Sequence, residues 1–168
     1  APPSAFKNIV ITEIFADPGP QIGLPEAEFI ELYNRSSNPF DLADWQFTDG
    51  SAVASFSNYI LLPGEYLIVC ATNATGRFVA FGKTFGVALF PSLNNSGDAL
   101  VLKDPAGLMI DSVNYSERWY GDEEKKDGGW TLELIDPQNI CADGENWIAS
   151  EAEPGGTPGK QNSVFAEK

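Results

Sequence analysis

The chain has 168 residues and a formal net charge of -14, because 24 acidic residues outnumber 10 lysines and arginines. A surface this acidic repels phosphate backbones and anionic lipids, so we expect neither nucleic-acid binding nor membrane-surface binding. The sequence has no histidine, which excludes histidine-based catalytic triads and histidine-bearing zinc sites. No apolar run approaches the length of a membrane span, so membrane insertion is not expected either.

Short runs of β-branched and aromatic residues alternate with turn-forming clusters along the chain, and 16 glycines and 12 prolines interrupt any long helix. The predicted strands, in chain order, are 9–15, 28–33, one or two within 40–48, 52–57, 66–70, 99–102, 109–113 and 130–135. Asp104-Pro105-Ala106-Gly107 lies between two of them and predicts a hairpin. Residues 77–90 are ambiguous between a helical turn and an extended segment, and only turns are expected beyond residue 135.

Many short strands with almost no helix are typical of an antiparallel β-sandwich or barrel. The sequence shows no repeated unit and no internal linker. We therefore expect one all-β domain over residues 8–163, preceded by a leader or linker at 1–7 and followed by a tail at 164–168.

Several of the strand phrases form an ordered set. The set consists of Ile11-Thr12-Glu13-Ile14, Glu28-Phe29-Ile30-Glu31-Leu32-Tyr33-Asn34, Asp41-Leu42-Ala43-Asp44-Trp45, Leu62-Pro63-Gly64-Glu65-Tyr66, Leu93 to Leu102, Asp111-Ser112-Val113, Trp130-Thr131-Leu132-Glu133 and Asn146-Trp147. In this order, the phrases resemble a lamin tail domain of the bacterial, secreted kind. The closing Gly155-Gly156-Thr157-Pro158-Gly159 resembles versions found in Bacteroidetes-type surface proteins.

The resemblance implies an immunoglobulin-like β-sandwich that is not an enzyme. It implies a non-catalytic interaction or structural module of an exported bacterial protein, secreted or held at the cell surface, with a protein or glycan partner. We expect a monomer or a part of a larger multidomain chain. Two other classes stay open: a carbohydrate-binding or calcium-dependent adhesion module, and a carboxylate-based hydrolase.

Carboxylates are the one plausible catalytic or metal-binding chemistry in this sequence. Glu13 shares strand parity with Ile9 and Ile11, so we expect it to point toward the core, where it needs an arginine, backbone amides or a cation as partner. If the first two strands are neighbours, Glu13, Asp17 and Glu28 could converge as calcium ligands. No cofactor is otherwise indicated.

Trp119 and Tyr120 precede a glycine and a charged loop, so they could form a stacking platform for a sugar ring or cover the open edge of the sandwich. Cys70 lies in an apolar strand and Cys141 in the turn-rich tail. They could form a disulfide that tethers the tail, or remain a buried and a free thiol. The sequence leaves both pairs of alternatives open.

Overall fold

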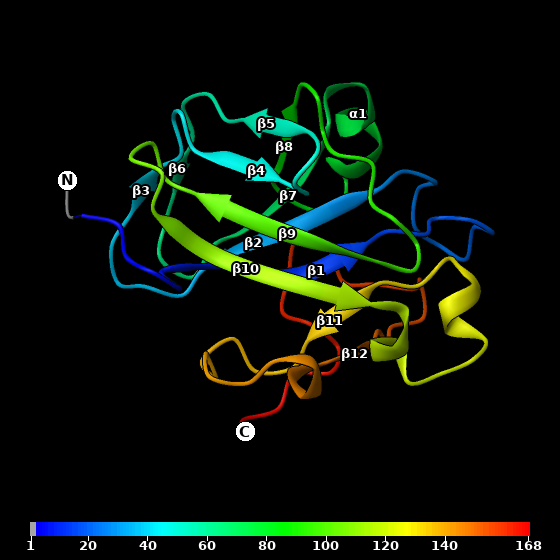
Figure 1. The fold of residues 1–168 in the computed structure, drawn as a ribbon. Helices are drawn as coiled ribbons and strands as arrows, with labels where there is room; N and C mark the ends of the chain where they lie inside the picture. The colour runs from blue at the N-terminus through cyan, green and yellow to red at the C-terminus, as the bar shows by residue number, and fades with distance from the viewer. Residues whose placement is uncertain (1–2) are drawn as a thin grey trace.

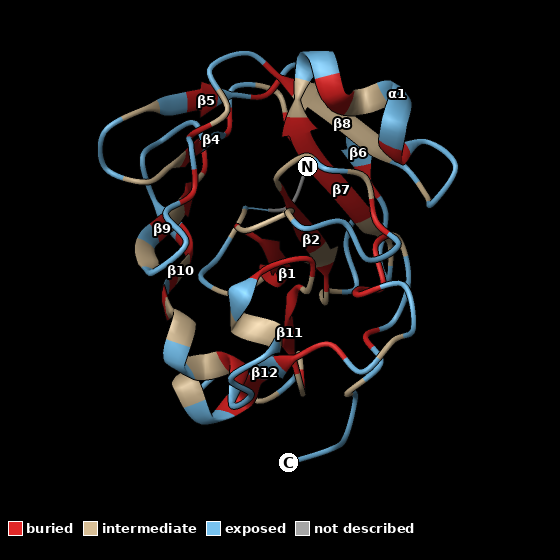
Figure 2. Ribbon diagram, turned by 90° about the vertical axis from the view of Figure 1, so that its right-hand side faces the viewer, coloured by how far each residue is buried: buried red, intermediate tan, exposed pale blue. Residues whose placement is uncertain are grey.

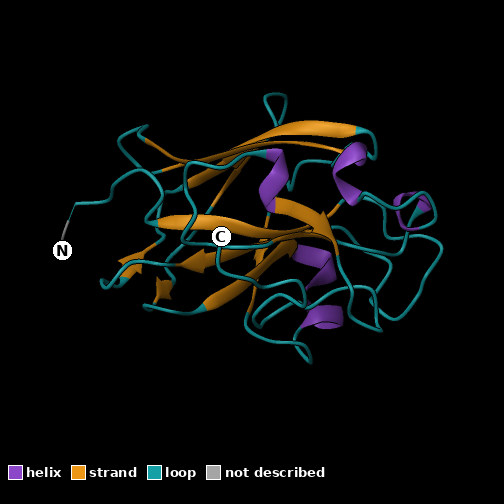
Figure 3. Ribbon diagram, turned by 90° about the horizontal axis from the view of Figure 1, so that it is seen from below, coloured by secondary structure: helices purple, strands orange, loops and turns teal. Residues whose placement is uncertain are grey.

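The computed structural model describes residues 3–168 and shows a chain built mainly from short strands joined by turns (Figure 1). The strands are β1 (Ile9–Phe15), β2 (Phe29–Asn34), β3 (Phe40–Asp41), β4 (Gln46–Thr48), β5 (Val53–Ser55), β6 (Ile60–Leu61), β7 (Tyr66–Ala71), β8 (Thr84–Val87), β9 (Gly97–Lys103), β10 (Met109–Ser116), β11 (Leu132–Leu134) and β12 (Trp147–Ala149). The helical segments are α1 (Thr75–Phe78) and 3₁₀ turns at Thr72–Ala74, Glu117–Tyr120, Lys125–Asp127 and Gly144–Asn146. They gather in the half of the molecule away from the N-terminus (Figure 3). Within the described residues, no helix has the length and apolar character needed to cross a membrane.

The strands form two main sheets and one small pair. The six-stranded sheet has the order β12-β11-β1-β2-β7-β8, the four-stranded sheet has the order β10-β9-β4-β5, and β3 pairs with β6. Neighbouring strands are antiparallel except β7 and β8, which are parallel. This arrangement confirms the predicted all-β, immunoglobulin-like sandwich.

The main core lies between the two sheets. Ile11 and Leu32 of the six-stranded sheet belong to the same apolar cluster as Phe47 and Leu102 of the four-stranded sheet. Buried residues are concentrated on the strands, whereas the connecting loops and much of α1 are exposed (Figure 2). Burial of this apolar surface is the main force that holds the two sheets together.

The strands predicted at 9–15, 28–33, 66–70 and the hairpin around Asp104–Gly107 are confirmed as β1, β2, β7 and β9–β10. The ambiguous segment contains both α1 and the short strand β8. The expectation that only turns follow residue 135 is wrong, because β12 pairs with β11 in the register Leu134↔Trp147. A strand of three residues is too short to show an alternating pattern in the sequence.

The outer face of the six-stranded sheet, which points away from the four-stranded sheet, is also covered. One half packs against α1, where Phe15, Phe29 and Phe78 form a second apolar cluster with Ile68 and Cys70. The ring centroids of Phe29 and Phe78 are 5.1 Å apart in an edge-to-face arrangement. The other half lies under residues 154–163, which we call the C-terminal strap. Because both faces are covered, all of β1 is buried.

A β-bulge around Thr12 determines the face on which Glu13 lies. The register between β1 and β2 shifts between Ile11 and Glu13. As a result, Ile9 and Ile11 face the main core, whereas Glu13 lies opposite Glu31 and shares the outer face with Phe15. The prediction that Glu13 follows the parity of Ile11 toward the core is therefore wrong, because a bulge adds one residue to the strand.

Candidate functional site

A groove of about 420 Å³ lies on the surface beside α1. It forms where the loop after β1, the end of β7 with α1, and the connection between β8 and β9 meet. Its lining consists of Pro18, Glu26, Ala27, Glu28, Ala71, Asn73, Ala74, Arg77, Phe90, Pro91 and Ser92. Its volume falls within the range of ligand pockets, and its lining is apolar with a few polar groups, as binding sites usually are.

The groove is held in shape by contacts that cross it. The carboxylate of Glu28 accepts a hydrogen bond from the backbone N–H of Leu93 at 2.7 Å, and the Arg77 guanidinium donates to the carbonyl oxygen of Glu26 at 3.2 Å. Phe90 packs on Phe47 of the core, with ring centroids 5.8 Å apart. Burial raises the pKa of Glu28, and the nearby Asp17 carboxylate raises it further. The groove therefore combines an apolar floor with a partly desolvated acid.

The three predicted calcium ligands do not converge. β1 and β2 are neighbours, as the hypothesis required. However, the three acids lie in two different places. Asp17 and Glu28 lie together beside the groove, whereas Glu13 is fully buried under the C-terminal strap. In the described part of the chain, no group of three or more aspartate, glutamate or cysteine side chains is arranged to hold a metal ion.

Glu13 lies instead in a cluster with Glu31 and Glu133, and all three side chains have no exposed surface. Glu13 is the Cα partner of Glu133 on β11 and of Glu31 on β2, so the three occupy adjacent positions across three strands. The Glu13 carboxylate accepts hydrogen bonds from the Thr131 hydroxyl at 2.7 Å and from the Thr157 N–H at 2.8 Å. Of the partners expected for a buried Glu13, a backbone amide is the one found, and the Thr131 hydroxyl is a partner that was not expected.

The sequence phrases that include Glu133 and residues 155–159 of the strap carried the family resemblance, but no buried site was expected there. The available signal was a charged residue inside an apolar run: Glu133 between Leu132 and Leu134, and Glu31 between Ile30 and Leu32. In a strand covered on both faces, such a residue must be buried with polar partners. Those partners come from Thr157, Gly159 and Ser163, which are too far away in sequence to be paired by inspection.

Trp119 and Tyr120 are mainly packing residues. Tyr120 is buried, and its hydroxyl donates to the carbonyl oxygen of Trp130 at 3.1 Å. Trp119 is partly buried and stacks on Trp147 with ring centroids 6.1 Å apart, while Gly144 lies against its indole. Tyr120 is therefore not available to stack on a sugar, which corrects the platform alternative for this residue.

A neighbouring surface cavity of about 260 Å³ has a polar lining. It is formed by Glu117, Arg118, Gly121, Asp122, Glu123 and Lys126. A flat apolar ring is what a sugar ring needs as a stacking surface. The charged side chains of this cavity do not provide one.

The two cysteines are not bridged. Cys70 is a buried free cysteine in the apolar cluster beneath α1, and Cys141 is an exposed free cysteine. The structure therefore contains the second alternative, a buried thiol and a free thiol, and not the disulfide. Burial raises the pKa of the Cys70 thiol to about 11, which keeps it protonated and unreactive near neutral pH.

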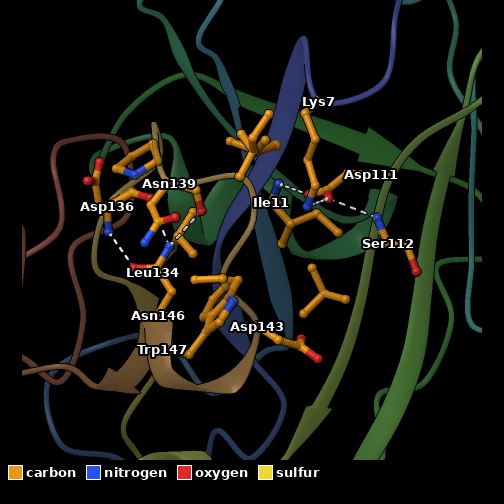
Figure 4. Close-up of a pocket in the computed structure, with 15 residues that line it drawn as sticks. Lys7, Ile11, Asp111, Ser112, Leu134, Asp136, Asn139, Asp143, Asn146 and Trp147 are labelled. Atoms are coloured by element: carbon orange, nitrogen blue, oxygen red, sulfur yellow. Dashed lines mark hydrogen bonds and ion pairs between the residues drawn. The ribbon is translucent and has the colours of Figure 1, made fainter. Parts of the chain in front are cut away.

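A small pocket of about 30 Å³ lies where β1, β10 and the segment before β12 meet (Figure 4). Lys7 and the buried Asp111 form an ion pair at 2.5 Å on its edge, and Asp111 also accepts from the N–H groups of Ile11 and Ser112. Burial raises the pKa of Asp111, although Lys7 opposes this effect. A cavity of this size has room for about one water molecule, so we assign it a structural role.

Fold and site together define an immunoglobulin-like β-sandwich module that has a surface groove and a fully covered acidic cluster. The family model named Lamin Tail Domain matches residues 2–117, which is more than half of the chain. The chain therefore belongs to the lamin tail domain family, whose members are modules of the protein-interaction type.

Similarity beyond the family model is limited. No curated protein matches this sequence. A solved structure of a DUF4876 family protein from Bacteroides thetaiotaomicron VPI-5482 is similar to this chain, with a TM-score of 0.48 and 12% sequence identity. The match covers 88% of this chain and 69% of that chain.

Proposed function

We propose that this chain is a non-catalytic interaction module of an exported bacterial protein, and that the groove beside α1 is its binding surface. The groove carries the proposal, because it combines an apolar floor with a partly buried acid at the surface. The sequence phrases shared with exported bacterial lamin tail domains support a position outside the cytoplasm. The hydrogen bonds from the C-terminal strap to three strands of the six-stranded sheet support a domain that extends to residue 163.

The position of the carboxylates argues against hydrolysis. Glycoside hydrolysis needs two carboxyl groups that both reach the substrate. The three glutamates that lie together in this fold have no exposed surface and are covered by the strap. The acids that line the groove, Glu26 and Glu28, act together with apolar and guanidinium groups as a recognition surface.

The groove chemistry indicates the kind of partner. Ala27, Ala74 and Phe90 offer an apolar floor to a side chain of moderate size. The Glu28 carboxylate offers an acceptor for a neighbouring cation, and the net charge of -14 attracts basic segments. We therefore propose that the partner is a protein segment in which an apolar residue lies next to a lysine or arginine.

A peptide-display selection against the whole domain tests this proposal. We expect the selected peptides to carry an apolar residue beside a basic one. Their binding should weaken at least tenfold in Asn73→Trp, which fills the groove, and should weaken in Glu28→Gln, which removes the charge. Asn114→Trp is the matched control, because Asn114 is exposed on β10 in the other sheet. Peptides that bind Asn73→Trp as tightly as the native protein would refute the groove as the site.

Two further results bear on partner and location. With a net charge of -14, no retention on duplex DNA is expected in about 0.15 M salt, where screening is incomplete. A shifted DNA band at micromolar protein would contradict this. In its native host, the protein should be accessible to protease added to intact cells or to cells whose outer membrane has been permeabilised, and protection in both would place it inside the cytoplasm instead.

A further inference from the structure

The three buried glutamates lie outside the groove, and their carboxylates are close enough to repel one another. Glu31, Glu13 and Glu133 lie side by side on β2, β1 and β11. Side chains directly opposite each other on antiparallel strands have Cβ atoms only about 5 Å apart, and like charges in such pairs are destabilising. All three side chains are fully buried, so water does not screen them.

The C-terminal strap is attached to the sheet through these same carboxylates. The Thr157 N–H donates to Glu13 at 2.8 Å, the Gly159 N–H donates to Glu31 at 2.6 Å, and the Ser163 hydroxyl donates to Glu133 at 2.6 Å. The Thr157 hydroxyl also donates to Glu133. Glu13 and Glu31 therefore each hold one point of the strap, and Glu133 holds two.

Asn162 adds a fourth attachment that involves no charge. Its side-chain amide donates to the backbone carbonyl oxygens of Thr12 at 2.7 Å and Leu134 at 2.9 Å. Gly156 brings the strap close to the sheet, because a Cβ at this position would lie 2.7 Å from the Glu13 carboxylate. The strap therefore packs closely against the cluster and is hydrogen-bonded to the sheet on which the cluster lies.

The charges around the cluster do not balance three carboxylates. Lys160 on the strap is the cation whose charge reaches Glu13, and it is exposed to solvent. Tyr66 on β7 faces Glu31, and its neighbour Tyr33 lies beside it. Burial raises the pKa of Tyr66 to about 12, so it stays neutral in the range considered. Within the described residues, Glu13 Oε1 has no hydrogen-bond partner, although it is buried.

We propose that this glutamate cluster is a proton-held latch, in which a proton on Glu13 keeps the C-terminal strap closed on the sheet and loss of the proton favours its release. A carboxyl proton removes one of three crowded charges and makes the unpartnered Oε1 of Glu13 a hydrogen-bond donor. Protonation is the usual response of an acid that is buried without a counter-charge. The polar partners of the strap then bind a cluster of reduced charge.

The pKa shifts of Glu13 and Glu31 agree with the geometry. Burial, together with the charge of the neighbouring Glu133, raises the pKa of Glu13 from 4.5 to about 8. Burial and the charge of Glu13 raise the pKa of Glu31 well above its ordinary value. In an open state, with the strap released, the carboxyls contact water and their pKa values return toward 4.5. Opening between pH 4.5 and 8 therefore releases a proton, so it becomes tenfold easier for each pH unit.

Amide hydrogen exchange measured on the whole domain between pH 5 and 8 tests the latch. The observed rates of the Thr157 and Gly159 amides, divided by their intrinsic rates, give the opening equilibrium of the strap at each pH. We expect protection of these two amides to fall by about tenfold per pH unit, while amides in β9 and β10 keep a much weaker dependence. Protection that is constant over this range would overturn the proposal.

Glu13→Gln removes the titrating group and keeps the shape and the acceptor of the side chain. We expect its strap protection to lose most of the pH dependence. Glu153→Gln, an exposed acid next to the strap, removes the same charge and should keep the native slope. A native slope in Glu13→Gln would refute the assignment of the proton.

If Glu13→Gln does not fold, direct ¹³C titration of the glutamate carboxyls in the native protein replaces the variant. A buried glutamate that titrates near pH 8 supports the latch, and titration of all glutamates near 4.5 contradicts it. The native protein is also measured at pH 8 in calcium and in chelator. Protection that calcium restores and chelator removes would mean that a cation, not a proton, closes the strap.

Discussion

The outer face of the six-stranded sheet is covered in two different ways, although the same strands contribute to both. On β1, Phe15 lies under α1, while Glu13, two residues earlier, lies under the C-terminal strap. On β2, Phe29 and Glu31 are divided in the same way. One half of the face is thus sealed by aromatic packing, and the other half by carboxylates and hydrogen bonds.

The difference lies in what each half requires. The apolar half needs only shape and contact area, and its burial stabilises the fold at any pH. The acidic half buries three carboxylates, which costs free energy unless donors or protons compensate. The stability of the strap on the carboxylates therefore depends on pH and on individual hydrogen bonds, whereas packing of phenylalanine rings does not. We therefore expect the apolar half to carry stability and the acidic half to carry regulation.

The largest effect should come from the apolar half. Phe29→Ala removes a fully buried ring that contacts both Phe15 and Phe78. We expect a loss of about 3–5 kcal/mol in the free energy of unfolding, because both apolar contact and packing are lost. Urea unfolding measures it. Val79→Ala is the control, because Val79 is 61% exposed and should change stability little. A loss below about 1 kcal/mol for Phe29→Ala would show that the aromatic cover adds little to stability.

The second effect is a pH dependence of the free energy of unfolding, which we expect from the acidic half and not from the apolar half. In the folded state the pKa of Glu13 is about 8, whereas its ordinary value is 4.5, so between these values the folded chain binds more protons than the unfolded chain. The stability contributed by this proton is fully present below pH 4.5 and is lost as the pH rises toward 8. The expected slope is about 1.4 kcal/mol per pH unit for one proton.

Urea unfolding of the native protein and Glu13→Gln at pH 5, 6, 7 and 8 measures this slope. Their difference isolates Glu13 from the other acids of the chain. The variant should gain stability relative to the native protein as the pH rises. Phe29→Ala should retain the native slope, since the apolar half contains no carboxylate of the cluster. Equal slopes in the native protein and Glu13→Gln would remove the distinction between the two halves.

A smaller effect tests how closely the strap fits. A Cβ at Gly156 would lie 2.7 Å from Glu13 Oε2 and from Thr131 Cγ2, and 2.8 Å from Leu24 Cδ1. Gly156→Ala should therefore cost about 1–3 kcal/mol through overpacking. Gly76→Ala is the matched control: Gly76 lies in α1, and nothing is within 4 Å of an added Cβ. There, alanine should be neutral or stabilising. Equal effects at the two positions would mean that the strap has room to move aside.

The sequence predicted a sandwich or barrel because its short β-branched and aromatic runs end in strong turn signals. The two phrases Ile9–Phe15 and Tyr66–Cys70 could be recognised without knowledge of their partners, since their patterns are local. The bulge around Thr12 could not be recognised, because it depends on how β1 pairs with β2. That single irregularity decides whether Glu13 faces the core or the strap.

The acidic cluster was beyond sequence reasoning for a related reason. Thr157 donates to Glu13 from 144 positions away, and Gly159 donates to Glu31 from 128 positions away. Glycine and proline in the strap indicated turns, but they did not indicate what the turns contact. Glu13 was correctly expected to need polar partners, because burial of a carboxylate demands them. The identity of those partners required the fold.

The smallest effect on stability should come from the cysteines, and it tests whether the apolar half is sealed. Cys70 has no exposed surface and lies with Phe29 and Phe78, whereas Cys141 is exposed. A maleimide reagent should therefore modify one thiol in the native protein and two after unfolding without reductant, because reaction requires an accessible thiolate. Modification of Cys141 should leave the free energy of unfolding nearly unchanged. If unfolding exposed no free thiol, the two cysteines would be bridged in solution. If Cys70 reacted in the native protein as fast as Cys141, the cover formed by α1 would open readily, and the apolar half would be the more dynamic of the two.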